Sequence, residues 1–345
     1  MYKGVMVIGE QRGGKLHPVT YELLARGRVL ADKLSEELSC VILGYGMEQF
    51  AEEIIQRGAD IVYIVDNPTL KNFLPLLYTR VLTKLTQEVK PGIVLAAATT
   101  QGRTIMPLVA AKLDTGLTAD CTELDIDLKD KSLLQTRPAI GGNVMATIKT
   151  PVSRPQMATV RPKSTKPLPV NKGKEGKVIL KDYETNLFST CEEFLGFIKD
   201  TTQDVNVQDA DIVVSGGKGL KTRDGFCMIE DLASLINAAV GATRDAVDLG
   251  WIEYPHQIGL SGKTVSPKLY IAIGLSGSVQ HLAGMQTSET IVAINKDKDA
   301  QIFKVADYGI VGDLFEIVPE LIEKLKNKKE GKDSLQKRSE IYDKV

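Results

Sequence analysis

The chain has 345 residues, of which 43% are hydrophobic and 25% are charged, with a formal net charge of -1. These values are typical of globular proteins, and the length predicts two domains. A balanced charge gives no reason to expect nucleic acid or an anionic membrane surface as a partner, because both need a clustered basic surface.

The first 120 residues alternate short apolar runs with amphipathic segments. This alternation indicates βα units on a parallel sheet, and strands that are almost wholly apolar fit burial on both faces. Between residues 120 and 160, shorter and more polar runs predict a hairpin or added antiparallel strands. The predicted strands lie at 4–9, 40–43, 61–65 and 93–97, and the predicted helices at 19–37, 47–57, 71–89 and 103–113.

A segment rich in Pro, Lys and Gly, residues 161–204, precedes a second α/β unit, and we place the linker at its end. The second unit is predicted to contain a strand after Asp211, a helix at 225–240, strands at 269–273 and 291–294, a short strand near Phe303 and a helix at 314–326. The fold class is therefore α/β, with two α/β domains and mainly parallel sheets. The predicted domains are 1–204 and 205–326, followed by a charged tail, 327–345, that is either a solvated helix or disordered.

The four cysteines, Cys40, Cys121, Cys191 and Cys227, lie far apart without CxxC spacing. Neither a zinc site nor an iron-sulfur cluster is suggested, so we expect no metal and predict buried free thiols in a reducing compartment. No apolar run approaches the roughly 18 residues of a membrane span, and the first residues lack the pattern of a secretory leader. We therefore expect no direct membrane insertion and a cytoplasmic location.

The segment from Leu269 to Asn295 has the pattern strand, glycine loop, helix, strand. The strand leads into Gly274-Leu275-Ser276-Gly277, and a helical pattern with His281 near its start follows. The first turn of a helix exposes unpaired backbone N–H groups, which attract anions. The segment therefore predicts a phosphate site, although an ordinary strand-to-helix turn in a parallel sheet has the same appearance.

Two further glycine-rich loops occur in the second half. Gly216, Gly217 and Gly219 surround Lys218, so backbone amides can approach a phosphate while the lysine supplies a charge. This spacing is neither a Walker motif nor GxGxxG. A third loop, at 259–262, follows Arg244, and three loops at one pocket would suit a long ligand that carries phosphate.

Motifs from both halves of the chain share one family pattern: GLTAD at 116–120, QTRPAIGGNVMATI at 135–148 and RPQMATVRP at 154–162, then VVSGGKGL, LYIAIGLSGSVQHLAGM, AINKD and VADYGIVGDL. In this order they resemble the alpha subunit of electron transfer flavoprotein, over nearly all of the chain to about residue 326. The resemblance implies a heterodimer with a beta subunit, in which the second, doubly wound domain holds FAD and the first domain is a docking scaffold.

The same resemblance implies an electron carrier that acts as an oxidoreductase only as part of a complex. Its redox partners would be an acyl-CoA dehydrogenase or a quinone-reducing flavoprotein. The family's flavin site maps onto Lys218, Thr243, Arg244, Ile258, Gly259, Leu260, Ser261, Ser276, Gly277, Ser278, Val279, Gln280, His281, Asn295, Asp313 and Leu314.

Some of these positions depart from the mitochondrial form of the family, which has Arg at 218, Ser at 243 and the loop GQTG at 259–262. Lys218 keeps the charge but loses a bidentate fork, and Thr243 keeps a hydroxyl. Leu260 removes a polar ligand while Ser261 still offers a hydroxyl. The GLSG loop is similar to that of electron-bifurcating members, so these changes are expected to shift flavin potentials rather than abolish binding.

His281 and Arg244 are our candidates for the groups that stabilise negative charge on a reduced flavin. A charge-assisted hydrogen bond contributes roughly 1.5 to 3 kcal/mol, equivalent to a shift of roughly 65 to 130 mV. Without the family resemblance, the ordinary interpretation of His281 is a core histidine and that of Arg244 a surface ion pair. Asp313 and Ser276 could likewise be plain helix caps.

Two alternatives stay open at the level of the sequence. The chain could be the alpha subunit of an electron-bifurcating complex that oxidises NADH and reduces ferredoxin together with a second acceptor. It could also be a non-redox module that binds an adenine nucleotide through its glycine loops, in which case the protein purified with its partner would be colourless.

Overall fold

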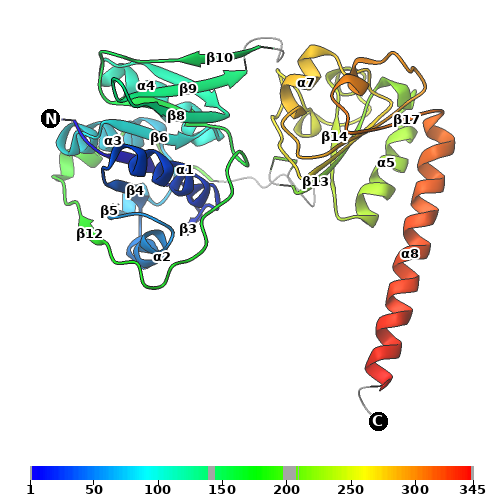
Figure 1. Cartoon of the computed structure of the whole chain (residues 1–345), viewed down its shortest axis with the longest axis horizontal. Helices are drawn as coiled ribbons and strands as arrows, with labels where there is room; N and C mark the ends of the chain where they lie inside the picture. The colour runs from blue at the N-terminus through cyan, green and yellow to red at the C-terminus, as the bar shows by residue number, and fades with distance from the viewer. Residues whose placement is uncertain (1, 139–143, 197–206, 209, 343–345) are drawn as a thin grey trace. The chain divides into compact units, whose positions relative to one another are not determined.

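The computed structural model describes every residue except 1, 139–143, 197–206, 209 and 343–345, and it describes side chains as far as Lys328 (Figure 1). Contacts between Cα atoms divide the chain into two compact units, Met1–Phe197 and Ile198–Val345. Each unit contains a parallel sheet covered by helices, which confirms the predicted α/β class. Among the described helices, none has both the length and the apolar character that a membrane crossing requires.

The first unit is built on a sheet of seven parallel strands in the order β12-β5-β4-β1-β6-β11-β7. Chain order changes direction between β1 and β6, as in doubly wound sheets. A short hairpin, β2 and β3, follows β1. The strands are β1 (Val5–Ile8), β2 (Gln11–Arg12), β3 (Lys15–Leu16), β4 (Leu38–Gly44), β5 (Ile61–Asp66), β6 (Ile93–Ala97), β7 (Leu117–Cys121), β11 (Gln156–Val160) and β12 (Lys177–Leu180).

Helices cover both faces of this sheet because alternate side chains of each strand point to opposite faces. Val5 and Val7 pack with one pair of helices, α1 and α2, whereas Met6 and Ile8 pack with the other pair, α3 and α4. Burial on both faces accounts for the apolar character of the strands. The helices are α1 (Val19–Leu34), α2 (Ala51–Gln56), α3 (Pro75–Val89) and α4 (Thr100–Lys112).

The antiparallel strands predicted between residues 120 and 160 are present as a separate sheet in the order β10-β9-β8 (Figure 1). This sheet packs against α1 and against β7. Part of the QTRPAIGGNVMATI motif, residues 139–143, lies outside the described residues. The strands are β8 (Glu123–Asp127), β9 (Ser132–Pro138) and β10 (Met145–Ile148).

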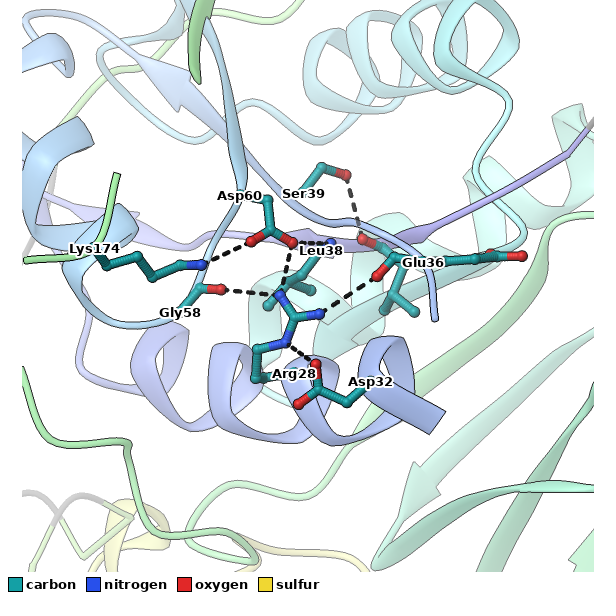
Figure 2. Close-up of polar contacts among 9 residues, drawn as sticks. Arg28, Asp32, Glu36, Leu38, Ser39, Gly58, Asp60 and Lys174 are labelled. Atoms are coloured by element: carbon teal, nitrogen blue, oxygen red, sulfur yellow. Dashed lines mark hydrogen bonds and ion pairs between the residues drawn. The ribbon is translucent and has the colours of Figure 1, made fainter. Parts of the chain in front are cut away.

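A cluster of charges joins α1 to the amino ends of β4 and β5 (Figure 2). Arg28 donates to Oδ2 of Asp60 at 2.7 Å and to Oδ1 of Asp32 at 2.8 Å. The same Asp60 carboxylate accepts from the backbone N–H of Leu38 at 2.8 Å and from Nζ of Lys174 at 2.7 Å. Burial alone would raise the pKa of Asp60, but these donors hold the pKa below its ordinary value. Asp60, which precedes β5, therefore ties its own segment to α1, to the start of β4 and to the segment of Lys174.

Glu22 of α1 is another half-buried carboxyl, and its partial burial raises its pKa to about 7 although the backbone N–H of Lys163 donates to it at 2.5 Å. The pKa of Glu22 in the folded protein exceeds its unfolded value of about 4.3, so ionisation of Glu22 lowers the free energy of unfolding. This cost is absent below pH 4 and is complete once the pH has risen through 7. We expect Glu22→Gln to unfold like the wild type at pH 4 and to be more stable at pH 8, by on the order of 3 kcal/mol. Circular dichroism melts at both pH values measure this.

The exposed Glu48 supplies the control for that experiment, since Glu48→Gln removes a carboxylate that is open to solvent. It should leave the pH dependence of unfolding as it is in the wild type. Equal melting curves for Glu22→Gln and the wild type at pH 8 would contradict the raised pKa of Glu22.

The second unit contains a five-stranded parallel sheet in the order β14-β13-β15-β16-β17. Helices α5, α6 and α8 pack on one face, with α5 against α8, and α7 packs on the other face (Figure 1). The elements are β13 (Ile212–Gly216), α5 (Asp224–Leu235), β14 (Ala239–Ala242), α6 (Arg244–Asp248), β15 (Leu269–Ile273), α7 (Val279–Met285), β16 (Ile291–Asn295), β17 (Tyr308–Val311) and α8 (Leu314–Tyr342).

Several details of the sequence-based prediction were wrong. The helix predicted at 225–240 ends at Leu235, and the following Ala239–Ala242 form β14. The strand predicted near Phe303 is a 3-10 turn, Gln301–Lys304, and the strand β17 begins at Tyr308. The closing helix continues to Tyr342, so as far as that residue the charged tail follows the helical one of its two predicted alternatives. Cys40 and Cys121 are buried thiols, as expected, whereas Cys191 and Cys227 are exposed.

Candidate functional site

A cavity of about 580 Å³ lies where the loops that follow β13, β14, β15 and β16 meet. Within the second unit the strand order corresponds to 2-1-3-4-5, so the connections from β13 and β15 leave in opposite directions. Ligands of open α/β sheets bind in the crevice that such a change of direction creates at the carboxyl ends of the strands. The cavity therefore occupies the position at which this topology predicts a ligand.

Most of the predicted ligand residues line this cavity, although they come from four separate loops. Those that do are Lys218, Thr243, Arg244, Ile258, Gly259, Leu260, Ser261, Ser276, Gly277, Ser278, Gln280, His281 and Asn295. Gly219, Gly274 and Leu275, which belong to the predicted phosphate loops, also line the cavity. The sequence analysis assigned no role to the remaining lining residues, which are Asp245, Asp297 and Ala300.

Val279, Asp313 and Leu314 are the predicted residues that do not line the cavity. Val279 is half exposed on the first turn of α7. Oδ1 of Asp313 accepts from the backbone N–H of Phe315 at 2.9 Å, as a helix-capping side chain does. Leu314 is buried in the core between the sheet and α8. Both residues at the start of α8 thus have a structural role, and their predicted contact with the cofactor stays a prediction.

The loops after β13 and β15 interlock at the centre of the cavity wall. The backbone N–H of Gly219 donates to the carbonyl of Gly274 at 2.8 Å, and that of Gly217 donates to the carbonyl of Ile273 at 3.1 Å. A Cβ atom on Gly219 would lie 2.6 Å from the Gly274 carbonyl oxygen, so no other residue fits without displacing backbone. The glycines thus let the two loops approach each other closely, whereas the sequence predicted that their amides approach a phosphate.

The same wall carries hydrogen-bonding groups that have no partner within the described part of the chain. These are the backbone N–H groups of Ser276, Gly277 and Ser278, and the buried Oγ1 of Thr243. Of these groups the Thr243 hydroxyl is buried, and a buried polar group without a partner is rare and costly in native proteins, whereas Ser276 and Ser278 are exposed residues. Consecutive N–H groups in a glycine loop suit an anion, so the donors fit the phosphates of a dinucleotide.

Two cationic side chains lie at the mouth of the cavity. Lys218 is exposed and forms no ion pair with the described residues. Nε of Arg244 contacts Oδ2 of Asp248 at 3.1 Å, one turn away on α6, and both side chains are well exposed. Because exposed pairs of this kind contribute little free energy, Arg244 could exchange Asp248 for a ligand at low cost.

The loop after α6, residues Ile258 to Ser261, is held in place from several sides. Oγ of Ser261 accepts from Nε2 of Gln257 at 3.0 Å, and its carbonyl accepts from the hydroxyl of Tyr254 at 3.1 Å. The backbone N–H of Leu260 donates to the carbonyl of Gln280 on α7 at 2.7 Å, while the Leu260 side chain is exposed. The loop is thus a fixed part of the cavity wall.

His281 is almost completely buried beneath this loop, with 4% of its surface exposed. Its Nδ1 lies 3.1 Å from the carbonyl of Ile258, and its Nε2 lies 2.9 Å from the hydroxyl of Tyr270. Burial lowers the pKa of His281 to about 4, against the effect of the Ile258 carbonyl, which raises it. The imidazole is therefore neutral at pH 7, and both of its nitrogens have partners in the protein.

Comparisons with known proteins identify the family. Residues 5–184 match the family described as electron transfer flavoprotein domain, and residues 206–286 match the electron transfer flavoprotein FAD-binding domain. The chain is 51% identical to electron transfer flavoprotein subunit alpha of Thermoanaerobacterium thermosaccharolyticum over 95% of this chain and 99% of that protein. It is 45% identical to the subunit of the same name from Megasphaera elsdenii, over 95% of this chain and 98% of that protein.

A third relative is the lactate dehydrogenase (NAD(+),ferredoxin) subunit LctC of Acetobacterium woodii, which is 41% identical over 97% of this chain and 79% of that protein. The family matches cover both units, and the FAD-binding match covers the loops after β13, β14 and β15. The likeness favours a redox role over the non-redox nucleotide module. The chain belongs to the family of electron transfer flavoprotein alpha subunits, carries its FAD-binding domain, and is by family the partner of a beta subunit.

Proposed function

We propose that the cavity described above holds the FAD of a heterodimeric electron carrier. The unpartnered N–H groups of Ser276, Gly277 and Ser278 would bind the diphosphate, with Lys218 balancing its charge. Thr243, Arg244 and Ser261 would contact the remainder of the cofactor from the loops on the opposite wall. The bound flavin would supply the capacity to accept and release single electrons.

The observation that carries this proposal is the meeting of unpartnered donors and glycine-lined backbone at the topological switch point of the second sheet. A ligand with two phosphates would accept hydrogen bonds from those donors. Without such a ligand, only water could accept them. The experiment is to purify the chain together with its beta subunit and to measure the flavin by absorption and by extraction. A colourless complex that does not take up added FAD would end the proposal.

Replacing Lys218 by Gln tests the phosphate contact. We expect the Kd for FAD to rise about 10- to 100-fold, because a hydrogen bond to a charged group contributes about 1.5 to 3 kcal/mol. Quenching of FAD fluorescence on titration with the apo-heterodimer measures the Kd. Lys221→Gln is the matched control, since Nζ of Lys221 lies 4.8 Å from the ring centre of Phe315 and the residue does not line the cavity. Equal effects of the two substitutions would contradict a specific role for Lys218.

The redox partners we propose are an acyl-CoA dehydrogenase or a quinone-reducing flavoprotein. A relative from Anaerotignum propionicum supports this proposal by its name, which is acryloyl-CoA reductase electron transfer subunit beta. That protein is 40% identical to this chain. Reduction of the purified heterodimer by a dehydrogenase and its substrate, followed at the flavin absorption bands, tests the donor side of this proposal.

A bifurcating complex is the second candidate function. It is favoured by the likeness to the lactate dehydrogenase (NAD(+),ferredoxin) subunit and by the GLSG loop at residues 259–262. The number of flavins in the heterodimer separates the two candidates. Two flavins together with oxidation of NADH would favour bifurcation, whereas one flavin and a partner site filled by AMP would favour the simple carrier.

A further inference from the structure

The hydrogen bonds of His281 determine which of its ring nitrogens carries the proton. The carbonyl of Ile258 can only accept, so Nδ1 must be the protonated nitrogen that donates to it. Nε2 of the neutral ring is then an acceptor, and the hydroxyl of Tyr270 must donate to it. The tautomer of His281 is therefore fixed by one partner on each side.

These three groups connect three different elements beneath the cavity. Tyr270 belongs to β15 and is fully buried, His281 belongs to α7, and Ile258 begins the loop that forms one wall of the cavity. The rings of Tyr270 and His281 lie 6.2 Å apart between centroids and are tilted by 59°. The chain of bonds runs from the sheet through the helix to the loop, on the side of the loop that faces the core.

The backbone of α7 holds the same loop through two further contacts. The N–H of Leu260 donates to the carbonyl of Gln280, as described above, and Gly284 faces Gly259 so closely that a Cβ atom on Gly284 would lie 2.4 Å from the Gly259 nitrogen. The close approach of α7 to this loop brings the carbonyl of Ile258 within hydrogen-bonding distance of the His281 imidazole. Without the ring, the carbonyl of Ile258 would lose its side-chain donor.

We propose that Tyr270 and His281 are positioning residues that fix the loop from Ile258 to Ser261 as a wall of the cofactor site. The hydroxyl of Tyr270 orients the imidazole, and the imidazole holds the carbonyl of Ile258. Neither side chain needs to donate a hydrogen bond to the cofactor in this arrangement. The inference rests on the proposed function only in taking the ligand of the cavity to be FAD.

The first test uses the intact heterodimer without FAD. The chain has three histidines, so the nitrogen-15 resonances of His281 can be assigned by comparison with His281→Gln. We expect the Nδ1–H tautomer of a neutral ring at pH 7. A ring protonated on Nε2, or a charged ring at that pH, would overturn the proposal.

The second test is the substitution Tyr270→Phe, which removes only the hydroxyl. We expect hydrogen exchange at the N–H groups of Gly259 and Leu260, followed by mass spectrometry, to become at least tenfold faster. The Kd for FAD should rise about fivefold. Tyr254→Phe is the matched control, because its hydroxyl bonds the same loop from the exposed side. It should change exchange less than Tyr270→Phe does, and a larger effect of Tyr254→Phe would overturn the proposal.

The outcomes distinguish this inference from the proposed function. Faster exchange in Tyr270→Phe, together with a wild type that binds no FAD, would support the positioning role and remove FAD as the ligand. Wild-type exchange in Tyr270→Phe, with tight FAD binding by both proteins, would remove the positioning role and leave the cofactor site standing. If Tyr270→Phe does not fold, His281→Gln replaces it, and unchanged exchange in that variant counts against the proposal.

Discussion

Valine at position 219 is expected to abolish FAD binding by the heterodimer, with a Kd at least about 100-fold above that of the wild type. A Cβ atom on Gly219 would lie 2.6 Å from the carbonyl oxygen of Gly274 and 2.8 Å from its Cα atom, and both are backbone atoms that cannot turn away. Relief requires the loops after β13 and β15 to separate, which moves the donors on both loops. Loss of two hydrogen bonds to a charged phosphate, each contributing about 1.5 to 3 kcal/mol, corresponds to at least about 100-fold in Kd, because each 1.4 kcal/mol is a factor of ten.

Fluorescence of Trp251 shows whether the second unit still folds in this variant, because Trp251 is the single tryptophan of the chain and lies in that unit. Gly173→Val is the control, since a side chain there would meet only ordinary contact, with Oδ1 of Asn171 at 3.6 Å. A folded Gly219→Val protein that binds FAD as the wild type does would show that the interlocked loops are not part of the cofactor site.

The substitution Asp60→Ala is expected to destabilise the first unit by on the order of 2 kcal/mol. The substitution removes the acceptor shared by Arg28, Lys174 and the N–H of Leu38. The cations remain half buried without their partner, and an unpaired polar group carries its full cost of desolvation. Circular dichroism should report an earlier melting transition, whereas the fluorescence of Trp251 should melt as in the wild type.

Asp32→Ala is the matched control, because Asp32 bonds the same Arg28 from an exposed position. Exposed pairs contribute little, so its effect should stay below about 1 kcal/mol. Since the pKa of Asp60 is held below its ordinary value, its contribution is present above about pH 4 and disappears as pH falls through the lower folded pKa. A difference between wild type and Asp60→Ala that persists undiminished in strong acid would contradict this account.

The fold was largely predictable because its strongest determinant is local. Runs such as Val5–Ile8 and Ile93–Ala97 are apolar at every position, which only strands buried on both faces require. The strand β14 was missed because Ala239–Ala242 consists of small residues that directly follow a helical pattern. Its strand conformation comes from pairing with β13, which no local propensity reveals.

The residues that line the cavity could be predicted where glycines mark a loop, and could not be predicted elsewhere. Close approach of backbone segments is indicated in the sequence itself by Gly217, Gly219 and Gly274. Asp245 and Asp297 also line the cavity, but isolated acidic residues in loops carry no distinguishing pattern. Their positions directly after β14 and β16 would have been the available signal. The meeting of four loops at one place follows from sheet order, which local periodicity does not encode.

His281 illustrates a limit of arguments from motifs. The motif SGSVQH correctly directed attention to this position, since the ring lies against the cavity wall. A charged imidazole would need exposure to solvent or to an anion, whereas this ring lies inside the core with a pKa of about 4. Burial depends on Tyr270 and Ile258, which are distant in sequence. The ordinary interpretation of a core histidine therefore describes its environment better.

The pairing of β12 with β5 also affects how the protein is made. Lys177 of β12 stands beside Ile61 of β5, although more than a hundred residues separate them in the chain. A ribosome that adds about 5–20 residues per second needs roughly 6 to 20 seconds to synthesise the intervening chain. During that interval the outer edge of β5 has no neighbour, and an open strand edge is a site for misassembly. The edge of β5 is therefore protected by β12 only late in the synthesis of the first unit.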